Sequence, residues 1–275
     1  MSPSPKKSGP PKRDRSGFYT LSSGEKLLSV TNIIKFGVPL DLTGWTAWEV
    51  ASLAVESVPR LSKVRGEVAR RDAVNWLKGA ADRKRDTAGD LGTAIHDAIE
   101  NHILGQPAPE PTAEQKPFMD AFARFLENER PEFEATEMVL AHPEHGWAGK
   151  ADVWMTLPNI GSAMLLGDWK SGSGVYSSAA LQLSGYKRAP VGWTQDGTEV
   201  VPPKVDDAVV VHIRPQKYPD TGYRIYPMDT SDDVYDCFLS ARKTAVKWMK
   251  GLEKTAVGEP YEPIVVAEVT EEEVA

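Results

Sequence analysis

The chain has 275 residues, of which 41% are hydrophobic, and a formal net charge of −7. This length and apolar content suffice for one large domain or two small ones, and the acidic balance argues against a protein that coats nucleic acid nonspecifically. The single cysteine, Cys237, excludes an intrachain disulfide, a Cys-rich zinc site and a four-cysteine iron–sulfur cluster.

The two ends of the chain are predicted to be poorly structured. Residues 1–17 are Pro, Ser, Lys and Arg with little apolar content, which predicts a disordered basic arm that is either a plain flexible terminus or a DNA tether. Residues 257–275 read as an acidic tail. The sequence shows neither a signal peptide nor an apolar run of membrane-spanning length, so we expect a cytoplasmic protein without a membrane partner.

Residues 18–86 are predicted to form a helical N-terminal region, helical from about residue 25. One stretch has the spacing of an amphipathic helix, formed by Trp45, Trp48, Val50, Leu53 and Ala54. The segment Arg60–Arg85 then carries nine basic residues against three acids. It is either a solvated helix face or a clamp for the phosphate backbone of nucleic acid.

Residues 87–256 are predicted to form an α/β core, with one mixed central sheet flanked by helices. Thr112 and Gln115 form a capping box at the start of one helix. The last helix is expected to bury Val234, Phe238, Ala241, Ala245 and Trp248. The expected helices are 87–104, one following the capping box, 178–188 and 232–250, and the expected strands are 137–141, 147–155, 163–170, 208–214 and 223–226.

Two carboxylates and a lysine are placed to meet at the end of this sheet. Side chains alternate along a strand, so Asp168 and Lys170 point to the same face, and Asp152 lies on the preceding apolar strand. Each acid alone has an ordinary explanation, as an exposed strand residue or a salt bridge. Two like charges side by side are costly unless a cation compensates, so the set suggests a divalent metal site. Gly149, just before Asp152, allows another group to approach the backbone.

Two helices offer further polar groups. His96 lies one helical turn after Gly92, whose missing side chain leaves space above the imidazole, although a lone helix histidine is often purely structural. Gln182 and Tyr186 are four residues apart on the helix after Lys170 and so share a face. They can hydrogen-bond a phosphate or the lysine, while Tyr186 can equally be a core residue.

Four segments together resemble a known group of enzymes. The segments Gly92–His96, Gly149–Asp152, Gly167–Gly172 and Gln182–Tyr186 occur in the order found in RecB-type nucleases of the PD-(D/E)XK, restriction-endonuclease-like superfamily. Ser29–Thr31 and the tryptophan-bearing helix after it look like the compact phage-type exonucleases of that group. CRISPR-associated RecB-like relatives often carry an iron–sulfur cluster, which this chain lacks the cysteines to build.

The resemblance implies a restriction-endonuclease-like αβββαβ core and a role for each residue. Asp152, Asp168 and the Trp169 carbonyl would bind a divalent metal, with His96 as a further ligand. Lys170 would position or deprotonate water. The remaining two, Gln182 and Tyr186, would orient DNA or the lysine. Independently, oxygen ligands favour Mg²⁺, and an imidazole makes Mn²⁺ a good substitute.

These observations predict a metal-dependent DNA exonuclease acting on single- or double-stranded DNA, in recombination, repair or phage DNA processing, in the cytoplasm of a bacterium or phage-infected cell. The alternative is a DNA-binding module with a vestigial nuclease site. An HD-type phosphohydrolase, suggested by His96–Asp97, is disfavoured. That chemistry needs several further His and Asp ligands on helices, but the chain has only five histidines, and three of them are expected in strands or loops. The sequence leaves the oligomeric state and the strand preference open.

Overall fold

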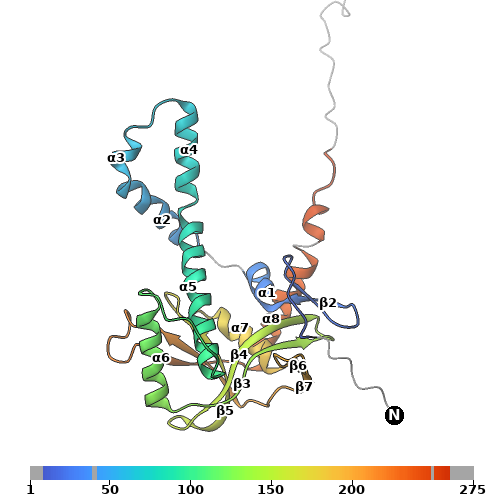
Figure 1. Ribbon diagram of the computed structural model, residues 1–275. Coiled ribbons are helices and arrows are strands. Elements are labelled where there is room, and N and C mark those ends of the chain that lie inside the picture. The colour runs from blue at the N-terminus through green and yellow to red at the C-terminus, as the bar shows by residue number, and fades with distance from the viewer. Residues whose placement is uncertain (1–8, 39–41, 249–250, 261–275) are drawn as a thin grey trace, which may run out of the picture.

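The computed structural model describes residues 9–38, 42–248 and 251–260. It confirms the predicted class, because helices cover both faces of a mixed nine-stranded sheet (Figure 1). The strands are β1 (Phe18–Thr20), β2 (Lys26–Ser29), β3 (Glu132–His142), β4 (Trp147–Leu157), β5 (Gly161–Lys170), β6 (Val191–Trp193), β7 (Glu199–Val200), β8 (Asp207–Ile213) and β9 (Tyr223–Met228). The helices are α1 (Val30–Gly37), α2 (Thr43–Glu56), α3 (Val58–Leu61), α4 (Glu67–Lys78), α5 (Ala80–Ile103), α6 (Lys116–Glu129), α7 (Ser178–Lys187) and α8 (Asp232–Lys247), followed by a 3₁₀ turn, Leu252–Lys254.

The sheet places the two predicted acid-bearing strands side by side at its centre. Its order is β7-β6-β3-β4-β5-β8-β9, and β2 pairs with β4 from outside this path. The β3–β4–β5 meander is antiparallel, whereas β5 and β8 are parallel, with Lys170 opposite His212. The crossover between β5 and β8 contains α7, so α7 begins shortly after Lys170. This is the βββαβ order predicted for the core, with β6 and β7 added between α7 and β8.

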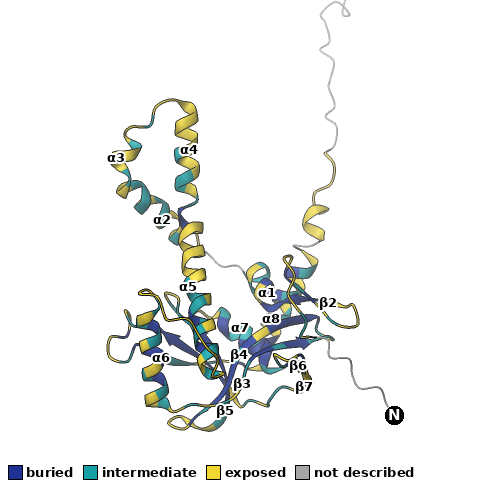
Figure 2. Cartoon of the chain, viewed as in Figure 1, coloured by how far each residue is buried: buried dark blue, intermediate teal, exposed yellow. Residues whose placement is uncertain are grey.

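Two apolar layers hold the helices on opposite faces of the sheet. One layer joins α1, α7 and α8 to the sheet through side chains such as Ile33, Leu183 and Phe238. The other joins α5 and α6 through Ile95 and Phe125. In Figure 2 the strands and the helix faces turned toward them form one buried interior. The predicted capping box is present at the start of α6. The backbone N–H of Thr112 donates to the side-chain Oε1 of Gln115, and the backbone N–H of Gln115 donates to the Thr112 hydroxyl.

The N-terminal prediction of helix from residue 25 is wrong at its start. Residues 26–29 form β2, because Leu27 and Leu28 are buried in the sheet, and helix begins only at α1, which Ser29 caps. The prediction of disorder also fails for residues 9–17, since Arg13 donates to the side chains of Ser29 and Asn32. Residues 1–8 lie outside the described residues, as do residues 261–275 of the predicted acidic tail.

Other boundaries shift for reasons of packing. Helix α5 begins at Ala80 rather than near residue 87, and β3 begins at Glu132 rather than at Glu137. The prediction that Trp248 is buried is wrong, because it follows the last packed turn of α8 and is 47% exposed. Residues 249–250 of that predicted helix lie outside the described residues. Tyr235 takes the expected place of Val234 in the core.

Helices α2, α3 and α4 stand away from the sheet and form, with the first part of α5, a projecting helical arm (residues 43–90; Figure 1). None of the residues of α2, α3 or α4 is buried. The predicted amphipathic helix is present as α2, and four of its five apolar positions are half-buried, namely Trp45, Val50, Leu53 and Ala54. Trp48 differs, because it is 70% exposed. The arm packs mainly on itself, through contacts of α2 with α4 and α5.

The turn between β3 and β4 gives a testable dependence on pH. His142 Nδ1 accepts a hydrogen bond from the His145 amide, which requires a neutral imidazole, and the two rings stack. Burial, with His145 beside it, lowers the pKa of His142, while Glu144 opposes this. The folded state thus binds fewer protons at this site than the unfolded state, so its contribution to stability is present above a pH of about 6.5 and is lost as the pH falls further.

We expect the difference in unfolding free energy between the wild type and His142→Gln to shrink as the pH falls from about 7.5 to about 5. Urea unfolding of both proteins across that range measures it, and the comparison cancels the titration of all other groups. A difference that stays constant, or grows on acidification, would contradict the assignment.

Candidate active site

Asp152 occupies the centre of the site because β4 is held between β3 and β5. Its Oδ2 accepts a hydrogen bond of 2.9 Å from the backbone N–H of Trp169 on β5. The Nδ1 of His96, on α5, lies 3.6 Å from the same oxygen, beyond a normal hydrogen bond. The structure therefore brings together the predicted helix imidazole and the predicted β4 acid.

Asp168 lies on β5 with the predicted lysine and amide around its carboxylate. It is 2% exposed, and the Lys170 ammonium forms an ion pair with its Oδ2. The amide of Gln182, on α7, donates to Oδ1 at 3.1 Å. The strand alternation that placed Asp168 and Lys170 on one face is confirmed by this contact. Since α7 follows β5 after a short loop, Gln182 reaches back to the end of the strand.

The side chains of the other two predicted site residues, Trp169 and Tyr186, are buried in the core next to the site. The Trp169 indole packs edge-on against Phe122 and Phe125, each at 5.6 Å, which fixes the β5 backbone. The Tyr186 ring is the group that Gly149 admits, because a Cβ on Gly149 would lie 2.5 Å from Tyr186 Cε1.

Burial and charge act against each other on the acid–lysine pair. Burial raises the pKa of the Asp168 carboxyl, and Asp152 adds to this, while the Lys170 ammonium opposes it. For Lys170, burial disfavours the charged form, but Asp168 and Asp152 outweigh it and raise the pKa of the amine. The ammonium is thus retained by the two carboxylates. Burial also raises the pKa of Tyr186 well above its ordinary value, so the phenol stays neutral.

Sequence reasoning missed two residues that fix the loop after Lys170. His212 is fully buried on β8, and its Nε2 lies 2.9 Å from the Gly172 carbonyl while Nδ1 meets the Tyr218 hydroxyl at 2.8 Å. Arg214, two residues on, donates to the Ser171 carbonyl. The only sequence signal was that the apolar strand 208–214 contains a histidine and ends on an arginine.

A second missed feature is Glu137, on β3. It lies between the residues paired with Val153 and Ala151, hence opposite Asp152, and its φ of +53° is unusual for a residue other than glycine. Its carboxylate is buried and forms an ion pair with Lys150. The sequence predicted only that a strand begins there, and nothing in the residue pattern announces the left-handed backbone.

The donor set suits a hard divalent cation, although no three of the His, Cys, Asp and Glu side chains in the described ranges are gathered as a ready-made metal group. Asp168 Oδ2 is buried and accepts no hydrogen bond of normal geometry, being met only by the Lys170 ammonium. The two carboxylates are ligands that suit Mg²⁺ and Mn²⁺, and the imidazole favours Mn²⁺ of the two. Asp152, Asp168 and His96 would hold such an ion, with Lys170 moved from its present contact.

Comparison with protein families finds no family model that matches the chain, and comparison with curated proteins finds no match. Among the helices that the structure describes, none combines the length and the apolar character needed to cross a membrane.

Proposed function

We propose that the protein is a metal-dependent deoxyribonuclease, more specifically an exonuclease, that hydrolyses phosphodiester bonds in DNA. The observation that supports this best is the pair of contact groups at neighbouring positions of β4 and β5. One joins His96 to Asp152, which accepts from the Trp169 amide, and the other joins Lys170 and Gln182 to Asp168. The resemblance to RecB-type nucleases rests on the same residues. We extend the proposal to a role in recombination, repair or phage DNA processing, within the cytoplasm.

The residues of the chain supply positioning and proton transfer. A divalent cation, when bound, lowers the pKa of its water and neutralises charge on the phosphate. The Trp169 amide and the Gln182 amide hold Asp152 and Asp168 in place. The carboxylate charges that raise the pKa of Lys170 would be offset by a cation held by Asp152, Asp168 and His96. The buried ammonium could then release its proton to solvent, and the neutral amine could accept one from water.

Purified protein should cut end-labelled linear DNA in the presence of Mg²⁺ or Mn²⁺ and should be inactive in EDTA. Closed circular DNA of the same sequence should resist if the enzyme needs an end. No cleavage of any substrate with either metal would overturn the proposal, and equal DNA binding with and without metal but no turnover would instead establish the vestigial binding module. Cleavage of circles would replace exonuclease by endonuclease.

Gln182→Leu tests whether the hydrogen bond from Gln182 to Asp168 contributes to metal affinity and cleavage. Without the amide, Asp168 loses its orienting hydrogen bond, and loss of such a partner costs about 10- to 100-fold in metal affinity or activity. Titration of DNA cleavage with Mn²⁺ measures both quantities. The exposed Gln216 provides a matched control, since Gln216→Leu should leave the titration unchanged. A Gln182→Leu curve identical to that of the wild type would show that the contact is dispensable.

A further inference from the structure

The helical arm has a charge opposite to that of the rest of the protein. The arm carries nine basic and seven acidic residues and is at +2, whereas the rest of the chain is at −9. All nine basic residues lie in its segment Arg60–Arg85, which has only three acids and is at +6. All nine basic side chains are exposed. In the described part of the chain only two of them are in ion pairs, Lys84 with Glu49 and Arg85 with Asp82. The segment Arg60–Arg85 of the arm therefore presents a local excess of positive charge to solvent.

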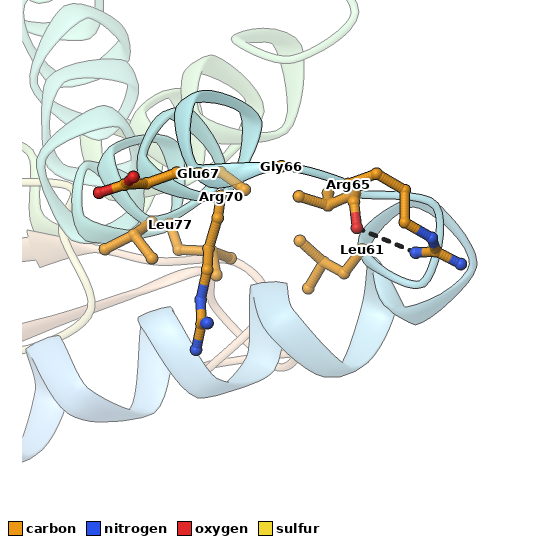
Figure 3. Close-up of a pocket in the computed structure, with 9 residues that line it drawn as sticks. Leu61, Arg65, Gly66, Glu67, Arg70 and Leu77 are labelled. Carbon is orange, nitrogen blue, oxygen red and sulfur yellow. Dashed lines mark hydrogen bonds between the residues drawn. The ribbon is translucent and has the colours of Figure 1, made fainter.

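The arm also presents apolar surface that the fold leaves uncovered. A groove of about 600 Å³ between α3 and α4 is lined by Leu61, Val64, Val74 and Leu77. Figure 3 shows Leu61 and Leu77 in this groove with the Arg70 side chain between them, whereas the Arg65 side chain turns away and donates to the Val64 carbonyl. The indole of Trp48, on α2, is 70% exposed. An arm that carries exposed cations, an exposed indole and an apolar groove suits a single nucleic-acid strand, whose base faces are free to stack, better than a duplex, whose base faces are hidden.

Helix α5 connects the arm to the acid cluster, and one of its faces is open. Arg85, Gly89, Gly92 and His96 are spaced by four, three and four residues, so they follow one face over about 16 Å. A Cβ on Gly89 would meet nothing within 4 Å, and one on Gly92 would meet only Ser171 Oγ at 3.5 Å.

Glycine in a helix interior costs about 1 kcal/mol relative to alanine. Neither Gly89 nor Gly92 has a neighbour in the fold that would exclude a methyl group. Their absent side chains leave room for something outside the fold to approach the α5 backbone, between the basic arm and the buried, incompletely satisfied carboxylate of Asp168.

We propose that the helical arm and this face of α5 form a track that binds a single strand of DNA and leads its backbone to the Asp152–Asp168 cluster. The arm supplies the electrostatic attraction, Trp48 and the groove contact the bases, and the glycine face lets the backbone pass His96 closely. This inference rests on the proposed function for what happens at the end of the track, but the binding itself does not require turnover.

The first test measures binding of a fluorescein-labelled oligothymidylate by anisotropy in EDTA, so that no cleavage intervenes. Arg70→Glu/Arg71→Glu, on α4, should weaken binding by about tenfold or more and reduce its salt dependence. The matched control makes the same charge change on α8, Lys243→Glu/Lys247→Glu, where all the altered side chains are likewise exposed, and should bind as the wild type does. Equal affinities of the two double variants, or tighter wild-type binding to a duplex of equal length, would overturn the track.

The second test separates the track from the chemistry. Gly89→Leu should keep or raise the melting temperature, because its position is open, and should lower cleavage of a long single strand about tenfold or more by blocking the face. Hydrolysis of thymidine 5′-p-nitrophenyl phosphate, too small to use the track, should be unchanged. Unchanged cleavage of both substrates would refute the track and leave the nuclease intact. A wild type inactive on both, with binding still lost in the arm variant, would refute the nuclease and leave the track.

Discussion

Asp168→Asn should lower DNA cleavage by about a thousandfold or more. A catalytic metal ion contributes several kcal/mol to stabilising the transition state of phosphodiester hydrolysis, and each 1.4 kcal/mol is a factor of ten in rate. Asp168 is the most buried acid of the cluster, and its Oδ2 accepts no hydrogen bond of normal geometry, so this oxygen has the most to gain from a cation. An amide keeps the size of the side chain but removes the charge. Initial rates on end-labelled linear DNA measure the loss.

A second readout shows whether the loss comes from the metal. Anything that binds only the folded state raises its stability, so Mn²⁺ should raise the melting temperature of the wild type but not that of Asp168→Asn. Asp220→Asn is the matched control, because Asp220 forms an exposed ion pair with Arg224 far along the chain from the cluster. It should retain both cleavage and the Mn²⁺ shift. An Asp168→Asn protein with wild-type rates would remove the basis of the proposed function.

The contacts of the site that could be predicted from the sequence follow from strand alternation and helix periodicity, and the folded protein keeps both. Asp168 and Lys170 share a face because strand side chains alternate, and a sheet cannot alter that alternation without a bulge. His96 reaches Asp152 because the apolar side of α5, with Ile95 and Ile99, fixes the rotation of the helix on the sheet. The residue pattern is sufficient to place a side chain where burial determines which face of its helix or strand turns toward the core.

The unpredicted part depends on partners that are distant in sequence. β2 is too short for a pattern of its own and exists because it pairs with β4, more than a hundred residues later. His212 reads as one polar residue in an apolar strand until the parallel pairing of β5 and β8 sets it beside Lys170. Trp48 shares the amphipathic spacing of Trp45 and Leu53, but it alone is exposed, because α2 in the projecting arm packs mainly against other helices of the arm.

Gly149 packs directly against the ring of Tyr186 next to the site, so a side chain at this position should be strongly destabilising. Gly149→Ala would place a methyl group 2.5 Å from Tyr186 Cε1 and 2.6 Å from its hydroxyl oxygen. Tyr186 is buried between α7 and the sheet and cannot swing into solvent, so β4 or α7 must shift. We expect a loss of about 3 kcal/mol in unfolding free energy from this overpacking, measured by urea denaturation. Gly44→Ala, on α2 with nothing within 4 Å, is the control and should be neutral or slightly stabilising.

The same pair allows the cause to be isolated, because removal of the ring should relieve the clash. Tyr186→Leu alone should destabilise by loss of packing, but Gly149→Ala combined with Tyr186→Leu should cost less than the two single changes together, by about 1 kcal/mol or more. Strictly additive losses would mean that the glycine is required for another reason. Asp152 lies three residues after Gly149 on β4 and takes its position from that strand. Gly149→Ala should therefore lower cleavage even under conditions where the variant is fully folded, as the Asp152 carboxylate moves away from the Trp169 amide that holds it.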